Sequence, residues 1–75
     1  MSRLPALTAR RVIQALERGG FHVARVKGSH HLLKHASNPR LRVTVPFHRG
    51  DLDARTLRSI IEQAGLGIDE FMKLL

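Results

Sequence analysis

The 75-residue sequence contains no cysteine, so neither a disulfide nor a thiolate metal site can stabilise it. It has no tryptophan or tyrosine and three phenylalanines, which leaves few aromatic rings on which a nucleobase could stack. No apolar run is long enough to cross a bilayer, and none follows Met1 as the core of a signal peptide would. We therefore expect one small soluble domain spanning residues 1–75, located in the cytoplasm.

Acidic residues are scarce in the first two-thirds of the chain. Residues 1–50 contain Glu17 as their single acidic residue against ten lysines and arginines, a charge of +9, whereas residues 51–75 carry −2. The chain as a whole has a formal net charge of +7. A basic region of this kind favours a polyanionic partner, most simply a nucleic acid.

Apolar periodicity predicts two main helices. Residues 8–18 repeat apolar positions at helical spacing after Thr8, a good N-cap, and Gly19 and Gly20 then end the helix. A second helix follows Asp53 as its N-cap and is closed by Gly65. A final short helix is predicted over residues 68–75.

Three strands are predicted between the two main helices, over residues 21–26, 30–35 and 41–45. In the first of them, Phe21 and Val23 are expected to face the core, with His22 and Ala24 opposite. Pro46 should end the third strand, because proline cannot continue a central ladder. The order α-β-β-β-α predicts a two-layer α+β fold, a three-stranded antiparallel sheet with both helices on one face. Double-stranded RNA-binding domains share this element order.

Residues 27–35 concentrate three of the five histidines, two lysines and a turn glycine, Gly28. Metal binding is the first possibility to test, but on a strand His31 and His35 lie roughly 13 Å apart and cannot chelate one ion. Their spacing also lacks the glutamate of a zincin helix. We predict no metal and no cofactor.

Metal-free acid–base chemistry is the remaining catalytic possibility. RNA carries its own nucleophile, the 2′-hydroxyl, and histidine can act as the acid or the base near neutral pH. Cations for the phosphate are available from Arg25, Lys27, Lys34 and Arg42, and Gly28 would let the backbone approach a phosphate. The residues themselves leave open a purely structural role for the histidines, and strand parity does not tell which sheet face His30 occupies.

Several motifs in order resemble those of the HicA (YcfA-like) family of toxin components. They are KGSHH at residues 27–31, VTVPFH at 43–48, Leu52, and TLRSIIEQAGL at 56–66, and the match covers about residues 8–66. The family often has glycine before the threonine, where this chain has Arg55. That position lies in the first turn of the second predicted helix, away from the expected site.

The resemblance implies a fold like that of double-stranded RNA-binding domains and the activity of an mRNA interferase. It also implies a HicB-type antitoxin that blocks the active site. The family's catalytic histidine follows the turn, which here gives His30, and the resemblance is carried over to that residue alone. Our leading hypothesis adds Lys27, Ser29 and Lys34 as neighbours that position the phosphate, with Gly28 also in contact with the RNA. A non-catalytic RNA-binding module using the same basic surface is the alternative hypothesis, and a degenerate toxin kept for its antitoxin interaction is a third.

Overall fold

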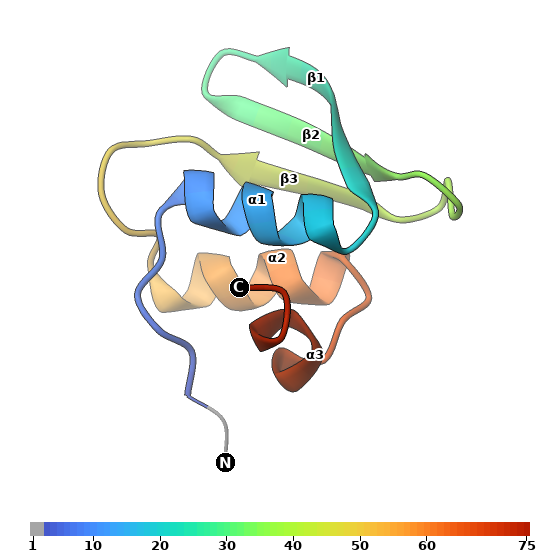
Figure 1. The fold of residues 1–75 in the computed structure, drawn as a ribbon. Coiled ribbons are helices and arrows are strands. Elements are labelled where there is room, and N and C mark those ends of the chain that lie inside the picture. The colour runs from blue at the N-terminus through green and yellow to red at the C-terminus, as the bar shows by residue number, and fades with distance from the viewer. Residues whose placement is uncertain (1–2) are drawn as a thin grey trace.

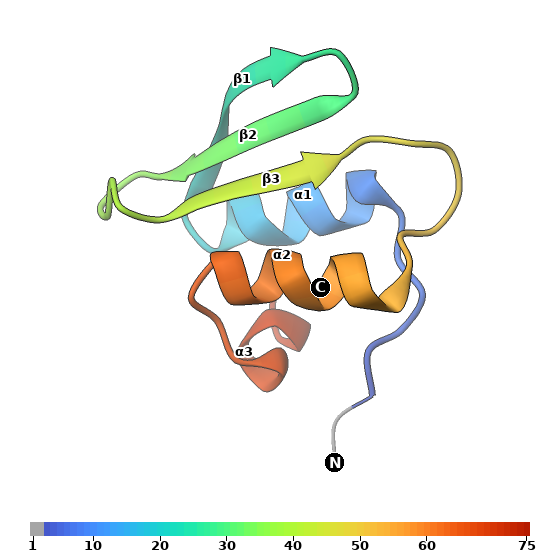
Figure 2. The ribbon, with the colours of Figure 1, turned by 180° about the vertical axis from the view of Figure 1, so that it is seen from behind.

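The computed structural model describes residues 3–75, which form three strands and three helices in two layers. The elements are α1 (Ala9–Arg18), β1 (Phe21–Lys27), β2 (His30–His35), β3 (Arg42–Pro46), α2 (Ala54–Gln63) and α3 (Ile68–Met72). The strands form one antiparallel sheet in the order β1-β2-β3. Helices α1 and α2 cover one face of this sheet, α3 lies below them, and the other face is open (Figures 1 and 2). The predicted α+β fold with its α-β-β-β-α order is confirmed.

Both main helices begin at the predicted caps. The hydroxyl of Thr8 accepts a hydrogen bond from the backbone N–H of Arg11 at 3.2 Å, and the carboxylate of Asp53 accepts one from the N–H of Thr56 at 2.7 Å. Such caps satisfy N–H groups that have no partner inside the helix. Because Thr56 donates to the carboxylate, the pKa of Asp53 lies below its ordinary value of 3.8.

The core lies between the sheet and the helices. Its central strand residues are Leu33, Val43 and Val45, each fully buried. Against them pack the apolar stripes that the periodicity predicts, together with Phe71 of α3; the buried helical residues are Ala9, Val12, Ile13, Ala15, Leu16, Leu57, Ile60 and Ile61. The open face of the sheet therefore contributes little to the core and is available for function.

Helix α3 is shorter than the prediction of residues 68–75. It ends at Met72, and the next residues continue in turns, with the N–H of Leu74 bonded to the carbonyl of Phe71 at 2.9 Å. The guanidinium of Arg18 donates to the carbonyl of Leu74 at 2.9 Å and so anchors this end to α1. Leu75, which the prediction placed in this helix, lies beyond its end and is 36% exposed.

Phe21 and Val23 both point to the core side of the sheet, as predicted, but only Phe21 is buried there. Phe21 is 4% exposed, whereas Val23 is 36% exposed. Val23 pairs with Leu33 and so points to the same side as the core, but β1 is an edge strand that extends beyond the helices (Figure 1). Directly after Val23 the register shifts by one residue at a β-bulge.

Candidate functional site

The pairing of β2 decides the face of His30. Side chains alternate along a strand, so His30, Leu32 and Lys34 share one face while His31, Leu33 and His35 share the other. Leu33 is fully buried beneath the helices. His30 therefore lies on the open face of the sheet, where it is exposed to solvent.

Four basic side chains share this face with His30. Residues directly opposite each other in an antiparallel sheet point to the same side. Lys27 is paired with His30, Arg25 with Leu32, and Arg42 with Lys34. The sheet thus brings together the predicted basic residues along three strands.

A shallow hollow lies at the centre of this group. Its accessible volume is about 210 Å³, and it is lined by Arg25, Lys27, His30, Leu32 and Thr44. Lys34 and Arg42 form the next cross-strand pair along the sheet and do not line it. No residue from 20 to 50 is acidic, so the positive charge of this face is not neutralised by its own strands.

The bulge in β1 places Arg25 and Lys27 on the open face. Val23 pairs with Leu33 and Arg25 with Leu32, which leaves Ala24 as the extra residue. Strict alternation from Val23 would have turned both cations toward the helices and Val26 outward. One additional residue reverses these directions, so the bulge builds the basic site.

The turn before His30 is held in place by the neighbouring strand. Gly28 has φ +58°, as the first residue of a two-residue hairpin turn requires, and a Cβ added there would meet open space. The carbonyl of Ser29 accepts a hydrogen bond from the N–H of Phe47 at 2.6 Å. This bond ties the turn to the end of β3 and fixes the start of β2, where His30 lies.

His31 and His35 have surroundings different from those of His30. The ring of His31 stacks on Phe47 with centroids 4.6 Å apart, and its Nδ1 is buried without a hydrogen-bond partner. This ring faces α1, where Arg10, Gln14 and Glu17 line the adjoining hollow. Its contacts are with the helix side of the molecule and not with the basic face.

Both ring nitrogens of His35 are used in the structure. Nδ1 accepts a hydrogen bond from the backbone N–H of Ser37 at 3.1 Å, so the proton of the neutral ring is on Nε2, which donates to the carbonyl of Gly19 at 3.1 Å. The ring also packs edge-on against Phe21, with centroids 4.9 Å apart. His35 therefore connects β2 to the end of α1, and both of its ring nitrogens are hydrogen-bonded within the protein.

Among residues 3–75, no three histidine, aspartate or glutamate side chains gather in a way that could hold a metal ion.

Sequence reasoning missed two features of the site. The first is the bulge in β1. The sequence does carry a signal for it, because the apolar residues of β1 are two positions apart at Phe21 and Val23 but three positions apart at Val23 and Val26. The other is the loop after β3, where Phe47, His48 and Arg49 line a separate cavity with the start of α1. Only the fold brings that loop to the helix.

The fold and the site together define a small two-layer α+β domain whose open sheet face carries a histidine among basic side chains. Comparison with family models identifies the chain further. Residues 9–66, most of the chain, match the model of the HicA toxin family, described as the HicA toxin of bacterial toxin-antitoxin. The chain belongs to this family, so it is the toxin component of a toxin-antitoxin system and has an antitoxin as its partner. A search of curated proteins found no match. No helix within residues 3–75 has the length and apolar character needed to span a membrane.

Proposed function

We propose that the protein is a metal-independent endoribonuclease that cleaves mRNA, with His30 as a general acid or base. The observation that supports this most is the position of His30 on the open face, in a hollow with Arg25 and Lys27. An imidazole, the side chain most often used as a general acid or base, lies there beside cations suited to a phosphate. The proposal applies to the same histidine that the family resemblance indicates.

The reaction uses the chemistry of RNA itself. The 2′-oxygen attacks the adjacent phosphorus and forms a new P–O bond, while the bond from phosphorus to the 5′-oxygen of the next nucleotide breaks. The proton of the 2′-hydroxyl goes to a base, and an acid supplies a proton to the leaving 5′-oxygen. The products are a 2′,3′-cyclic phosphate and a 5′-hydroxyl. His30 performs one of the two proton transfers.

The basic residues bind and stabilise the phosphates in this proposal. Lys27 and Arg25 line the hollow with His30 and would stabilise the negative charge that develops at the reacting phosphorus. Gly28 and Ser29 form the turn, whose open surroundings let the RNA backbone approach. Lys34 and Arg42 continue the basic face along the sheet and would hold a neighbouring phosphate.

The antitoxin would act by covering this face. We propose that it is a HicB-type protein that blocks access to His30, and that the open sheet face is its binding surface. A surface without acidic residues across three strands suits both an acidic protein and an mRNA in the cytoplasm.

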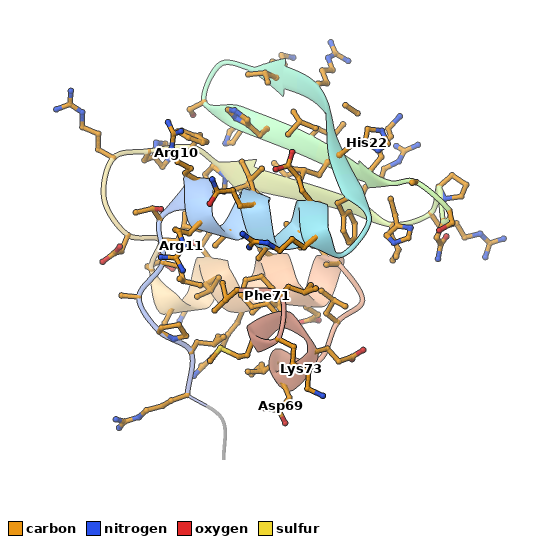
Figure 3. The ribbon with its side chains drawn as sticks, viewed as in Figure 1. Arg10, Arg11, His22, Asp69, Phe71 and Lys73 are labelled. Carbon is orange, nitrogen blue, oxygen red and sulfur yellow. The ribbon has the colours of Figure 1, made fainter. Side chains whose placement is uncertain are left out.

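Cleavage of a labelled RNA by purified protein in EDTA tests the proposal. We expect the wild type to cleave, and His30→Ala to lower the cleavage rate by about 10²–10⁴-fold, the usual contribution of a general acid or base. His22→Ala is the matched control, since His22 is also exposed and pairs with Lys34 on the same face (Figure 3). Thermal unfolding should be the same for both variants.

Three outcomes would contradict parts of the proposal. Undiminished cleavage by His30→Ala would refute the assignment of the residue. Cleavage lost in EDTA and restored by a divalent cation would refute metal independence. RNA binding by the wild type without any cleavage would favour the non-catalytic RNA-binding module instead.

A further inference from the structure

A second cavity lies outside the basic face, between the start of α1 and the loop that joins β3 to α2. It has an accessible volume of about 420 Å³, within the usual range of ligand cavities. Its walls come from two segments far apart in the sequence, residues 8–10 and residues 47–50. Arg10 extends from the start of α1 on the side of this loop (Figure 3).

Backbone bonds hold the two walls together. The N–H of Leu52 donates to the carbonyl of Leu7 at 2.8 Å, and Thr8 forms a β-bridge with Asp51. Gly50, with φ +81°, allows the loop to turn back toward the helix. The two backbone segments that carry the lining residues are therefore held at a fixed spacing.

The lining combines cations with an aromatic ring. Arg10 and Arg49 are exposed, and Phe47 is half-buried; His48 lies between Phe47 and Arg49 in the loop. No acidic residue lines the cavity. Guanidinium groups bind phosphate, and an aromatic ring offers a surface for a base or ribose. These are the groups that bind one nucleotide of a single-stranded nucleic acid.

The position of Arg10 supports an anionic ligand independently. The first turn of α1 contains no acidic residue and instead carries Arg10 and Arg11. The helix dipole disfavours cations at the amino end, so this arrangement lowers the stability of the free helix. A phosphate bound at Arg10 would bring negative charge to the amino end of α1, where the helix dipole favours it.

The cavity is close to His30 along the end of the sheet. His30 is paired with Pro46, and Phe47, the next residue, donates to the carbonyl of Ser29. The turn between β1 and β2, the loop after β3 and the start of α1 all lie at the same end of the molecule in both views (Figures 1 and 2). The cavity therefore lies at the end of the sheet where β2 begins with His30.

We propose that this cavity binds a further nucleotide of the substrate RNA, adjacent to the two that the cleaved bond joins, with Arg10 and Arg49 on its phosphate and Phe47 against its base or ribose. The inference rests on the proposed ribonuclease function for the identity of the ligand. It adds a second RNA-binding site, built from α1 and the β3–α2 loop, to the basic sheet face.

RNA binding by the His30→Ala protein tests the site without cleavage. A fluorescent single-stranded RNA and a dinucleotide are the probes, and anisotropy gives the Kd. We expect Arg10→Gln and Arg49→Gln each to raise the Kd of the longer RNA about tenfold, the effect of one charge-assisted hydrogen bond. The dinucleotide, which fills only the site at His30, should bind equally to all variants. The slope of log Kd against log salt should fall by about 0.7 for each lost contact.

Arg40→Gln and Arg58→Gln are the matched controls. Both arginines are exposed, and Arg40 lies in the β2–β3 connection at the opposite end of the sheet (Figure 1). Equal losses in the control variants would overturn the proposal in favour of general charge attraction. Unchanged RNA binding with weaker binding of the antitoxin would overturn it in favour of a protein site. If the wild type binds RNA at the cavity but never cleaves it, the proposed function fails, while the cavity stands as an RNA-binding site.

Discussion

The close approach of Gly20 to the ring of His35 allows a direct test of the structural role of that histidine. Gly20 has φ +97°, and a Cβ added there would lie 2.7 Å from Nε2 of His35. The ring cannot move away freely, because that nitrogen is bonded to the carbonyl of Gly19 and the ring packs against Phe21. Gly20→Ala must therefore displace the ring and break its hydrogen bond.

The expected cost has two parts. The positive φ disfavours any side chain by about 1–2 kcal/mol, offset in part by the lower entropy of the unfolded chain. Loss of the hydrogen bond of His35 adds about 1 kcal/mol. Gly28→Ala is the control, since Gly28 also has a positive φ but no atom near the added Cβ. Gly20→Ala should thus lower the Tm by about 4–8 °C more than Gly28→Ala, the shift expected for about 1 kcal/mol in a domain of this size.

A double-mutant cycle with His35→Ala isolates the contact. Backbone strain at position 20 is present in both backgrounds and cancels, so the cycle should give a coupling of about 1 kcal/mol by chemical denaturation. Additive effects of the two substitutions would refute the structural role assigned to His35. His35→Ala alone should be less stable than the wild type. In a separate RNA cleavage assay, it should retain activity at temperatures where it is folded.

Two further predictions concern the cap of α2 and the basic face. Asp53 has a pKa lowered in the folded protein, so its contribution to stability is complete above its unfolded pKa of about 4 and is lost as the pH falls through the folded value. The Tm difference between wild type and Asp53→Asn should therefore be larger at pH 7 than at pH 3 by circular dichroism, and a constant difference would exclude this role of the carboxylate. Arg25→Gln should raise the KM for RNA cleavage and reduce its salt dependence, because Arg25 lines the hollow with His30. Arg40→Gln should leave both unchanged, and an equal effect of the two would argue against a phosphate contact at Arg25.

Local signals predicted most of the fold. Thr8 and Asp53 form the caps that their residue types indicate, and the glycines after each helix end them. These features depend on hydrogen bonds within a few residues, which a sequence displays directly. The end of α3 lies earlier than the prediction, and the residues after it make a distant contact that no local signal displays, the bond from Arg18 to the carbonyl of Leu74.

The face of His30 lies beyond such local signals. Alternation along β2 divides its side chains into two sets but does not say which set meets the helices. The answer comes from the burial of Leu33, which depends on the positions of α1 and α2. The composition of the site could be predicted from the sequence, whereas its assembly requires the register of all three strands.

The structure separates the histidines by what their nitrogens are bound to. His35 uses both nitrogens to connect β2 to α1, and His31 stacks on Phe47 on the helix side. His30 keeps its ring in solvent on the open face, where the bulge at Ala24 brings Arg25 and Lys27 beside it.

A histidine that must exchange protons with a substrate needs this exposure, and it also needs cations that the fold does not neutralise. Because the helices bury only the opposite face, these requirements are met without placing a charge in the core, which contains no buried polar residue among residues 3–75. The bulge is therefore the feature on which the proposed chemistry depends most, since without it the same residues would form the same sheet with the cations on the wrong side.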